Sequence, residues 1–284
     1  DPRRDEILVP GYTCYSVAAA AILASLRVRI VDIDPATLSY DRAQLDNADT
    51  SRVLALVSAN LYGLPNELGY LETFARARGI FMVDDAAQAM HASYEGRPVG
   101  SFGDVGIYSF DKGKNITSLQ GGAIVTRDDA IAAELSALLA ELPEETTAAT
   151  AANIAKLTAY TLLLRPWLYW IPANIPALGL GKTIYTTDMP MHRLSRFAGA
   201  LALRLFARID AITAERVRRA ARVRAALVDC TRLGPVAPLP HAAPVYLRQP
   251  CLAHAATERD KLIMALNQAG IGATGSFPQA LGDL

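Results

Sequence analysis

Short, mostly apolar runs alternate with longer amphipathic or alanine-rich segments through the first half of the chain. Apolar runs bounded by turn residues are typical of strands buried on both faces, and the longer segments between them are typical of helices. We expect strands at residues 6–9, 28–32, 53–58, 80–83, 105–110 and 123–126, and helices at 16–26 and 68–78. This alternation predicts an α/β fold with a mainly parallel central sheet flanked by helices.

The pattern changes after about residue 127. We expect helices at 130–142, 196–227 and 257–269, a loop or weak helix at 144–152, and a strand at 245–248. The chain becomes proline-rich from about residue 235 and then continues with a strand and a helix, as a small α+β domain would. We therefore predict a large domain at 1–150, a helical and aromatic-rich connecting region at 151–234, and part of a small C-terminal domain at 235–284.

Residues 157–180 are apolar enough to span a bilayer by count alone. Arg165 interrupts this segment, and Pro166, Pro172 and Pro176 break helical continuity. We expect a buried helix followed by an irregular segment at a domain or subunit contact, and no membrane span. Shallow contact with a membrane surface through 157–180 is the alternative.

The predicted helix at 196–227 carries a run of basic residues, namely Arg216, Arg218, Arg219, Arg222 and Arg224. Such a face is most often solvated surface, and contact with phosphate or a membrane is the alternative. The chain as a whole has a formal net charge of zero and a pI near 7.1, which argues against a nucleic-acid partner.

Three scattered cysteines provide neither a disulfide framework nor a zinc-ligand spacing, so we expect no metal site and a reducing, cytoplasmic environment. The first six residues contain no apolar stretch behind a basic start, so no signal peptide is expected there. The sequence also begins without a methionine.

An acidic residue follows directly after the apolar run at 80–83. Asp85 lies in the sequence Val-Asp-Asp-Ala-Ala-Gln-Ala, and open α/β sheets bind ligands at the carboxyl ends of their strands. A carboxylate at this point is well placed to meet a cationic ring nitrogen. The alternative is that Asp85 caps the N-terminus of the alanine-rich stretch after it.

Two lysines, Lys112 and Lys114, follow the predicted strand at 105–110. A lysine at a strand end beside a cavity can form an imine with an aldehyde or ketone if its pKa is lowered, and the Ser109 hydroxyl can hold a phosphate oxygen. Both lysines are candidates at this point, and the alternative is that both lie on the ordinary surface. Gly121 and Gly122 then allow close backbone approach or form a simple turn.

Taken together, residues 81–126 resemble the DegT/StrS family of sugar aminotransferases, which depend on pyridoxal 5′-phosphate (PLP). The family shows Glu/Asp-Asp-Ala-Ala-Gln-Ala, Gly-Ser-Phe-Gly-Asp, Ser-Phe-x-x-x-Lys-Asn and then Gly-Gly before a strand. This chain has the counterparts, in that order, at residues 84–89, 100–104, 109–115 and 121–122. The segments 9–20, 31–41, 61–67 and 193–210 also resemble the family. The resemblance implies a fold-type-I PLP transferase with a smaller C-terminal α+β domain.

The resemblance also implies roles for individual residues. The family's lysine lies five residues after the serine and directly before the asparagine, which selects Lys114 over Lys112 as the residue that forms the imine with PLP. Asp85 would pair with the protonated pyridine nitrogen, and Gln88 would hydrogen-bond the 3-oxygen of the ring.

The remaining cofactor-binding residues implied by the resemblance are Ser109, for the phosphate, and Asn115, beside the lysine. Tyr12 or Tyr15 would pack against the ring, although Cys14 stands where the family often has an aromatic residue. Glutamate would donate the amino group, and Lys114 would move the proton between the α-carbon of the amino acid and C4′ of the cofactor. The acceptor would be the ketone of a nucleotide-linked sugar. Relatives that dehydrate instead carry histidine at the lysine position.

This chain also departs from the family pattern. The family's Gly-Thr turn, which binds the phosphate, lies upstream of the strand at 6–9, so we expect an incomplete phosphate site and large domain here. His192 stands where the family has an asparagine contributed by a neighbouring subunit, and it either substitutes for that asparagine or lies on the surface. We expect a homodimeric aminotransferase. A non-catalytic or impaired PLP-binding relative, or another PLP activity on the same fold, is the alternative.

Overall fold

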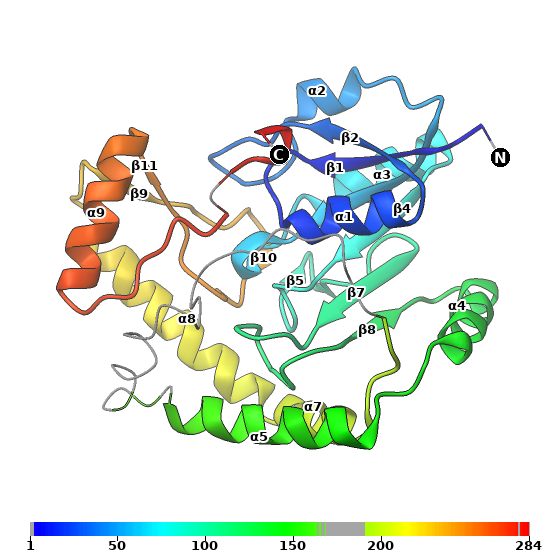
Figure 1. Cartoon of the computed structure of the whole chain (residues 1–284). Helices are drawn as coiled ribbons and strands as arrows, with labels where there is room; N and C mark the ends of the chain where they lie inside the picture. Colours follow the sequence, from blue (N-terminus) through cyan, green and yellow to red (C-terminus); the bar gives the residue numbers. More distant parts are fainter. Residues whose placement is uncertain (1–2, 164, 166–167, 169–190, 278, 284) are drawn as a thin grey trace.

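A six-stranded sheet with the order β2-β1-β3-β4-β7-β8 forms the centre of the molecule. This computed structural model describes residues 3–163, 165, 168, 191–277 and 279–283 (Figure 1). The strands are β1 (Glu6–Pro10), β2 (Arg27–Val31), β3 (Val53–Ala59), β4 (Phe81–Asp85), β7 (Val105–Ser109) and β8 (Gly122–Val125). The first five run parallel, and β8 pairs antiparallel with β7. The predicted mainly parallel sheet is therefore confirmed.

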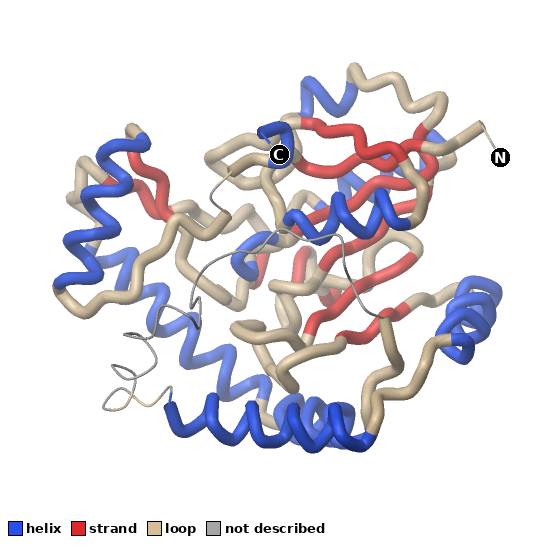
Figure 2. Tube along the Cα trace, viewed as in Figure 1, coloured by secondary structure: helices blue, strands red, loops and turns tan. Residues whose placement is uncertain are grey.

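Helices cover both faces of this sheet (Figure 2). Successive side chains of a strand point to opposite faces, so Leu8 and Leu56 join the apolar core shared with α3 (Leu68–Arg78). Ile7 and Val57 instead join the cluster that lies against α1 (Tyr15–Leu23). Figure 1 shows α1 in front of the sheet, with α3 behind it. Strands that are apolar on both faces are the sequence property that requires these two layers.

Two short helices and a glycine cap complete this half of the chain. Asp41 caps α2 (Arg42–Asp46) by accepting a hydrogen bond from the Gln44 N–H. The turn that follows β3 contains the 3₁₀ helix η1 (Leu61–Gly63). Helix α3 has the predicted bounds of 68–78 and is followed by Gly79, whose φ of 59° gives a left-handed cap.

The second half of the chain contributes long helices and very short strands. The helices are α4 (Asp129–Glu141), α5 (Thr147–Leu163), α7 (Arg196–Phe206), α8 (Ile209–Ala226) and α9 (Ala256–Gln268), with a final 3₁₀ turn η3 (Leu281–Asp283). Strand β10 (Ala242–Ala243) joins β5 (Ser93–Tyr94) and β6 (Arg97–Pro98) in one small sheet, and β11 (Cys251–Ala253) pairs with β9 (Leu233–Pro235) in another. The predicted helices at 130–142 and 257–269 are confirmed.

Four predictions for this half were wrong, wholly or in part. Residues 147–152, expected as a loop or weak helix, begin α5, and no residue of α5 is buried, although the apolar composition of 157–163 predicted a buried helix. The remainder of 157–180 lies outside the described residues, except for residues 165 and 168. The predicted helix at 196–227 divides into α7 and α8, because Ala207 and Arg208 separate them.

Residues 245–248 were predicted as a strand but do not form one. Pro244 and Pro250 flank the segment and cannot extend a hydrogen-bonded ladder on either side of it. The Val245 N–H instead donates to the Gly63 carbonyl at 3.0 Å, so the segment packs along η1.

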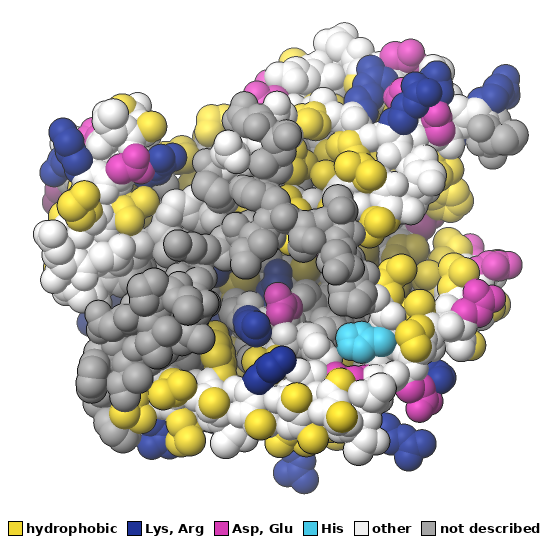
Figure 3. Space-filling model, viewed as in Figure 1, with side chains coloured by type: hydrophobic (Ala, Val, Ile, Leu, Met, Phe, Trp, Pro, Cys, Tyr) yellow, Lys and Arg dark blue, Asp and Glu magenta, His cyan; other side chains and the backbone are white. Residues whose placement is uncertain are grey.

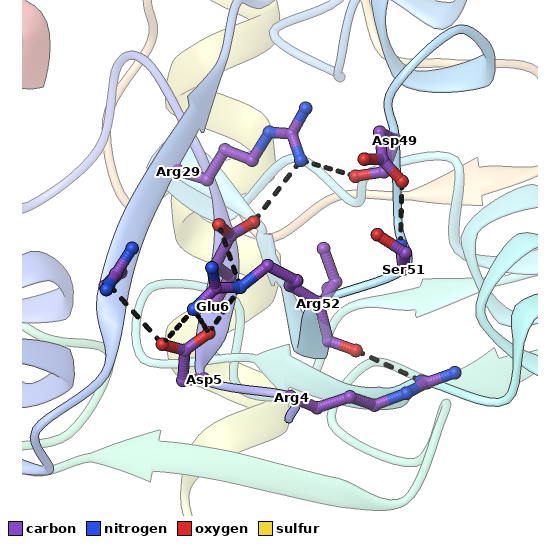
Figure 4. A network of polar contacts seen from close by, with 9 residues as sticks. Arg4, Asp5, Glu6, Arg29, Asp49, Ser51 and Arg52 are labelled. Carbon is purple, nitrogen blue, oxygen red and sulfur yellow. Dashed lines mark hydrogen bonds and ion pairs between the residues drawn. The ribbon is translucent and has the colours of Figure 1, made fainter. Parts of the chain in front are cut away.

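An ion network ties the amino ends of the central strands together (Figure 4). Arg52 donates three hydrogen bonds to Asp5, at 3.0, 2.8 and 2.6 Å, and Arg29 donates one to Glu6 at 3.3 Å. Arg4 donates to the carbonyls of Val53 and Gly79 at 3.1 and 2.6 Å. Hydrogen bonds to Arg52 lower the pKa of Asp5. These contacts join β1 to β2, β3 and the end of α3.

The described residues form neither a membrane-spanning helix nor a cluster of metal ligands. No helix there is long and apolar enough to cross a membrane. No group of three or more histidine, cysteine, aspartate or glutamate side chains there is arranged to hold a metal ion.

Candidate active site

The candidate site begins at the end of β4, where two aspartates follow one another. In the sheet register, Asp84 lies beside Ser58 and Gly106, and Asp85 beside Ala59 and Ile107. Because neighbouring side chains of a strand point to opposite faces, the two carboxylates have different surroundings.

Asp84 is fully buried and supports the backbone around it. Its Oδ1 accepts from Asn60 Nδ2 at 2.8 Å, and its Oδ2 accepts from the Gly100 N–H at 2.5 Å and the Phe102 N–H at 3.3 Å. Burial raises the pKa of Asp84 to about 6, against the effect of these three hydrogen bonds. Asp84 thus joins the end of β4 to the turns that follow β3 and precede β7.

Asp85 has little support by comparison. Its Oδ1 accepts one hydrogen bond, from the Ala87 N–H at 2.9 Å, and residues 87–91 form turns rather than the helix that an N-cap would begin. Burial raises the pKa of Asp85, while this hydrogen bond and the nearby positive charge of Lys114 lower it. No basic side chain in the described part of the chain forms an ion pair with Asp85. A half-buried carboxylate of this kind can accept a cationic N–H group.

Gln88 is buried one turn further along, and its orientation is fixed. Its Oε1 accepts a hydrogen bond from the Tyr62 N–H at 2.9 Å. Tyr62 lies in η1 with a φ of 59°, a strained backbone conformation that points this N–H at Gln88. Since the oxygen is used, the Nε2 group of Gln88 is left to donate to an acceptor in the site.

The loop between β7 and β8 carries the two lysines. Lys112 is exposed and Lys114 is half-buried, close enough for its charge to act on Asp85. The Lys114 N–H donates to the Asp111 carbonyl at 3.2 Å, and Gly113 has a φ of 74°, so the chain turns sharply before Lys114. The structure thus brings Lys114, rather than Lys112, towards Asp85. Basic and acidic side chains gather in the hollowed centre of the face shown in Figure 3.

The residues after Lys114 hold the loop firmly. Asn115 is buried, and its Nδ2 donates to the Met90 carbonyl at 3.2 Å, while its Oδ1 has no donor among the described residues. Ile116 packs with Met90, Ala202 and Ile209, the last two from α7 and α8. Lys114 therefore lies between Gly113, where the backbone turns, and Asn115, which is anchored to Met90. Whether Asn115 contacts a cofactor stays a prediction.

Ser109 ends β7 at the same edge of the sheet. Its Oγ accepts a hydrogen bond of 3.3 Å from the Asp111 N–H, which leaves its O–H proton available to a phosphate oxygen. Backbone pairing with Gly122 places it beside the start of β8, where the Gln120–Gly121 turn leads in. In the described part of the chain, this edge gathers Asp85, Ser109 and the lysine loop.

The two candidate tyrosines have different surroundings. The Tyr12 hydroxyl lies 2.9 Å from the Tyr62 hydroxyl, and its ring meets the edge of Phe277 with centroids 5.4 Å apart. Tyr15 packs with the cluster between α1 and the sheet. Tyr12 is therefore linked to the residue that fixes Gln88.

His192 lies near a buried glutamate at the entrance to β8. The Glu145 side chain, which is 2% exposed, accepts from Gln120 Nε2 at 2.6 Å, and His192 Nε2 lies 4.0 Å from it. Burial alone raises the pKa of Glu145, but hydrogen bonds from Ser195, Thr150, Gln120 and Asn153 bring it below its usual value. His192 thus borders a structural cluster that joins the start of α5 to the segment before α7.

A family model for the "DegT/DnrJ/EryC1/StrS aminotransferase family" matches residues 2–159 and 179–283, which is most of the chain. The chain belongs to this family. Membership confirms the resemblance expected from residues 81–126.

Curated relatives in this family carry different names. A GDP-perosamine synthase from Caulobacter vibrioides is 35% identical over 134 residues, which cover 47% of this chain and 36% of the relative. A pleiotropic regulatory protein from Geobacillus stearothermophilus is 35% identical over 129 residues, which cover 45% of this chain and 35% of that protein. These matches thus span about a third of the length of each relative.

Solved structures of the family superpose over nearly the whole chain. A DegT/DnrJ/EryC1/StrS aminotransferase from Brucella abortus matches with a TM-score of 0.74 and 22% identity, over 98% of this chain and 66% of that one. GDP-4-keto-6-deoxy-D-mannose-3-dehydratase from E. coli with bound hydrated PLP matches with a TM-score of 0.70 and 22% identity, over 95% and 66%. The fold-type-I architecture is confirmed.

Several supporting residues had no role in the sequence-based prediction. The segment 61–67 contributed to the family resemblance, but nothing in its composition showed that Tyr62 would adopt a positive φ and hold Gln88. Asp84 differs from Asp85 only by one position in a strand. The strict alternation of strand side chains was the available indication that the two would differ.

Proposed function

We propose that this protein is a PLP-dependent aminotransferase that moves an amino group from glutamate to the ketone of a nucleotide-linked sugar. One observation carries the proposal: Lys114 lies within electrostatic reach of Asp85, a half-buried carboxylate without a basic ion-pair partner in the described residues, at the carboxyl edge of the sheet. Membership in an aminotransferase family and the name of the perosamine synthase relative support it.

The donor set of the site suits PLP. Asp85 offers a carboxylate to the pyridine nitrogen, Gln88 offers Nε2 to the ring's 3-oxygen, and Ser109 offers a hydroxyl to the phosphate. Lys114 supplies the amine that binds the cofactor aldehyde. The dehydratase neighbour that was solved with PLP supports this choice of cofactor.

PLP, when bound, withdraws electrons from the amino acid's α-carbon. The chain's own residues would control the protons. The Asp85 carboxylate would keep the pyridine nitrogen protonated, and burial makes that pairing strong because few other groups solvate the carboxylate. The released Lys114 amine would take the α-proton of glutamate and deliver it to C4′ of the cofactor. Gly113 would give the backbone next to Lys114 the freedom for this movement. The anchored Asn115 would hold the backbone on the other side of Lys114 in place.

We assign supporting roles to the remaining candidates. Tyr12 would border the ring of the cofactor because its hydroxyl contacts the Tyr62 hydroxyl. Tyr15 would pack against the ring from the side of α1. Asn115 would position the lysine loop and lie next to the cofactor. We further propose that residues 1–150 form the cofactor-binding domain, 151–234 the connecting region, and 235–284 part of the small domain.

We also propose a cytoplasmic homodimer. All three cysteines are free thiols, which suits a reducing compartment. Several large apolar side chains of α7 and the residues before it are exposed, including Met191 at 67%, Leu203 at 75% and Phe206 at 53%. A second copy of the chain is the occupant we propose for this face, and light scattering at several concentrations would test it.

Spectroscopy tests the proposed activity. Purified protein mixed with PLP should develop the visible absorbance band of lysine-bound cofactor, and glutamate should bleach it. A band that forms but does not respond to glutamate or other amino donors would contradict the aminotransferase proposal. That outcome would instead favour a non-catalytic PLP-binding protein, a candidate supported by the relative named as a regulatory protein.

A further inference from the structure

Two neighbouring arginines have no acidic partner in the described residues, and one of them lies beside the lysine loop. Arg216 projects from the middle of α8, and its Nη1 donates to the Leu247 carbonyl at 3.0 Å. Arg248, the next residue after Leu247, lies with its Nη2 3.9 Å from the position that a Cβ on Gly113 would occupy. The two arginines therefore come from separate elements and are joined through Leu247, the residue before Arg248, while Arg248 lies next to Gly113.

Several neighbouring arginines have partners within the chain, whereas these two have no acidic one in the part that the structure describes. On α8, Arg218 and Arg219 form ion pairs with Glu215, and Arg224 bonds the Tyr246 hydroxyl. Among the described residues, no carboxylate pairs with Arg216 or Arg248. Burial lowers the pKa of Arg216, and the positive charges of Arg219 and Arg248 lower it further. Like charges held together without a counterion are costly, and a bound anion would relieve that cost.

The position of Arg248 relates it to the rest of the candidate site. Its N–H donates to the Tyr62 carbonyl at 3.4 Å, and the N–H of the same Tyr62 holds Gln88. Gly63 cannot carry a side chain here, because a Cβ would lie 2.8 Å from Val245 and 2.9 Å from the Leu247 nitrogen, and its φ is 82°. The 245–248 segment is therefore packed closely on the turn that orients Gln88.

Exposure indicates which part of a substrate would reach these arginines. Lys114 and Arg216 are half-buried, whereas Arg248 is exposed. A sugar whose ketone reaches Lys114 must leave its other end directed towards solvent, past the rim where Arg248 lies. In a nucleotide-linked sugar, the groups next to the sugar are two phosphates, and planar guanidinium groups bind phosphate oxygens in pairs.

We propose that Arg216 and Arg248 form an oxyanion subsite that binds the diphosphate of the sugar-nucleotide substrate. This inference rests on the proposed function and adds the residues that select a phosphate-bearing acceptor. Arg248 supplies an accessible guanidinium at the rim. Arg216, held by the Leu247 carbonyl, supplies a second guanidinium in a fixed orientation.

Equilibrium binding tests the subsite without requiring turnover. Inorganic diphosphate and UDP would be titrated calorimetrically into PLP-loaded wild-type protein and into Arg248→Gln, with Arg222→Gln as the matched control. Arg222 is an exposed arginine of the same helix α8, so its loss changes the net charge equally. We expect Arg248→Gln to weaken both ligands about tenfold or more and Arg222→Gln to change them less than about twofold. Equal effects from the two variants, or no effect from either, would overturn the proposal.

A second measurement separates phosphate from carboxylate recognition. Glutarate, an unreactive dicarboxylate, and the rate of bleaching by glutamate should be unchanged in Arg248→Gln. If this variant impairs glutamate and glutarate but not diphosphate, the arginines bind the amino donor and the proposal is wrong. Arg216→Lys, which keeps the charge but loses the planar fork, should weaken diphosphate binding in the same direction. In wild-type protein, the PLP band could bleach with glutamate although diphosphate does not bind. That result would contradict this inference alone and leave the aminotransferase proposal intact.

Discussion

The two ends of the central sheet use the same residue types in opposite ways. At the amino ends of the strands, Asp5 and Glu6 are paired with Arg52 and Arg29 in the network of Figure 4. At the carboxyl ends, Asp85 has only one backbone hydrogen bond. Charges that are satisfied within the chain hold strands together, whereas charges left without a partner are available to a ligand.

Two adjacent residues, Asp84 and Asp85, show the same contrast. Asp84 and Asp85 share a strand, a residue type and a raised pKa, yet Asp84 accepts three hydrogen bonds from the protein and Asp85 accepts one. We expect the first to determine stability and the second to determine cofactor binding. Proteins commonly accept a local loss of stability where function needs an unsatisfied group.

The largest expected effect comes from removing the lysine. Lys114→Ala should abolish the visible band of bound PLP and lower transamination about 10³-fold or more, because both the covalent attachment and the general base are lost. Absorbance spectroscopy and a coupled assay for 2-oxoglutarate would measure this. Lys112→Ala is the matched control and should behave like wild type. A band that persists in Lys114→Ala would show that another residue holds the cofactor.

Exchanging each aspartate for asparagine should separate the two roles. Asp84→Asn should lower the free energy of unfolding by about 3 kcal/mol. The new NH2 group would face one of the N–H donors that now bond the carboxylate, so that hydrogen bond would be lost and two donors would be left together. Asp85→Asn should leave urea unfolding of the cofactor-free protein nearly unchanged but weaken PLP binding and slow transamination. The reverse pattern, with a folded and active Asp84→Asn and an unfolded Asp85→Asn, would invalidate the division between them.

The pH dependence of stability should also differ between the two ends of the sheet. The pKa of Asp84 is about 6 in the folded protein against an ordinary value of 3.8, so the folded state binds this proton more tightly. Its contribution to stability is complete below about pH 4 and decreases by about 3 kcal/mol as the pH rises through 6. Urea unfolding from pH 4 to 7 should therefore show this slope in wild type and lose it in Asp84→Asn. Identical slopes in the two proteins would contradict the prediction.

Asp5 should behave oppositely. Its pKa is lowered in the folded protein, mainly by the hydrogen bonds from Arg52, so its contribution is present above the unfolded pKa and is lost as the pH falls through the folded value. Comparing wild type with Asp5→Asn in acid would detect this difference. A stability contribution from Asp5 that grows as the pH falls would refute it.

The smallest effect should come from the amino-end network. Arg52→Ala should lower stability only slightly, because exposed ion pairs are screened by water and salt. The difference from wild type should shrink further in 1 M salt (roughly a 3 Å Debye length), and PLP binding should not change. A clear loss of PLP affinity in Arg52→Ala would show that the two ends of the sheet are coupled.

Most of the fold could be predicted from the sequence because the central strands are apolar on both faces. The strands from β1 to β8 of the large sheet and the helices α1, α3, α4 and α9 lie close to their expected positions. The two- and three-residue strands were not predicted, since runs that short have no period. Burial of α5 could not be judged either, because an apolar composition does not show which partner covers a helix.

The candidate site was predicted less completely. The motifs around Asp85, Gln88, Ser109 and Lys114 lie within one continuous segment, so their resemblance to a known family was sufficient to propose the chemistry. Arg248 and Tyr62 reach the site from distant segments, and Tyr62 acts through its backbone, for which residue type carries little information. Such contributions depend on tertiary packing and are visible only once the chain is folded.

The alternation at the end of β4 has a practical consequence for protein design. A strand offers its side chains in a repeat of two, so only every second position of a host strand faces a grafted ligand. A site of this kind grafted onto another parallel sheet must keep the same alternation. A buried, hydrogen-bonded residue such as Asp84 must come directly before the carboxylate that is to face the ligand. A graft displaced by one residue would place the charge in the hydrophobic interior and the anchor in the pocket, although its composition would be identical.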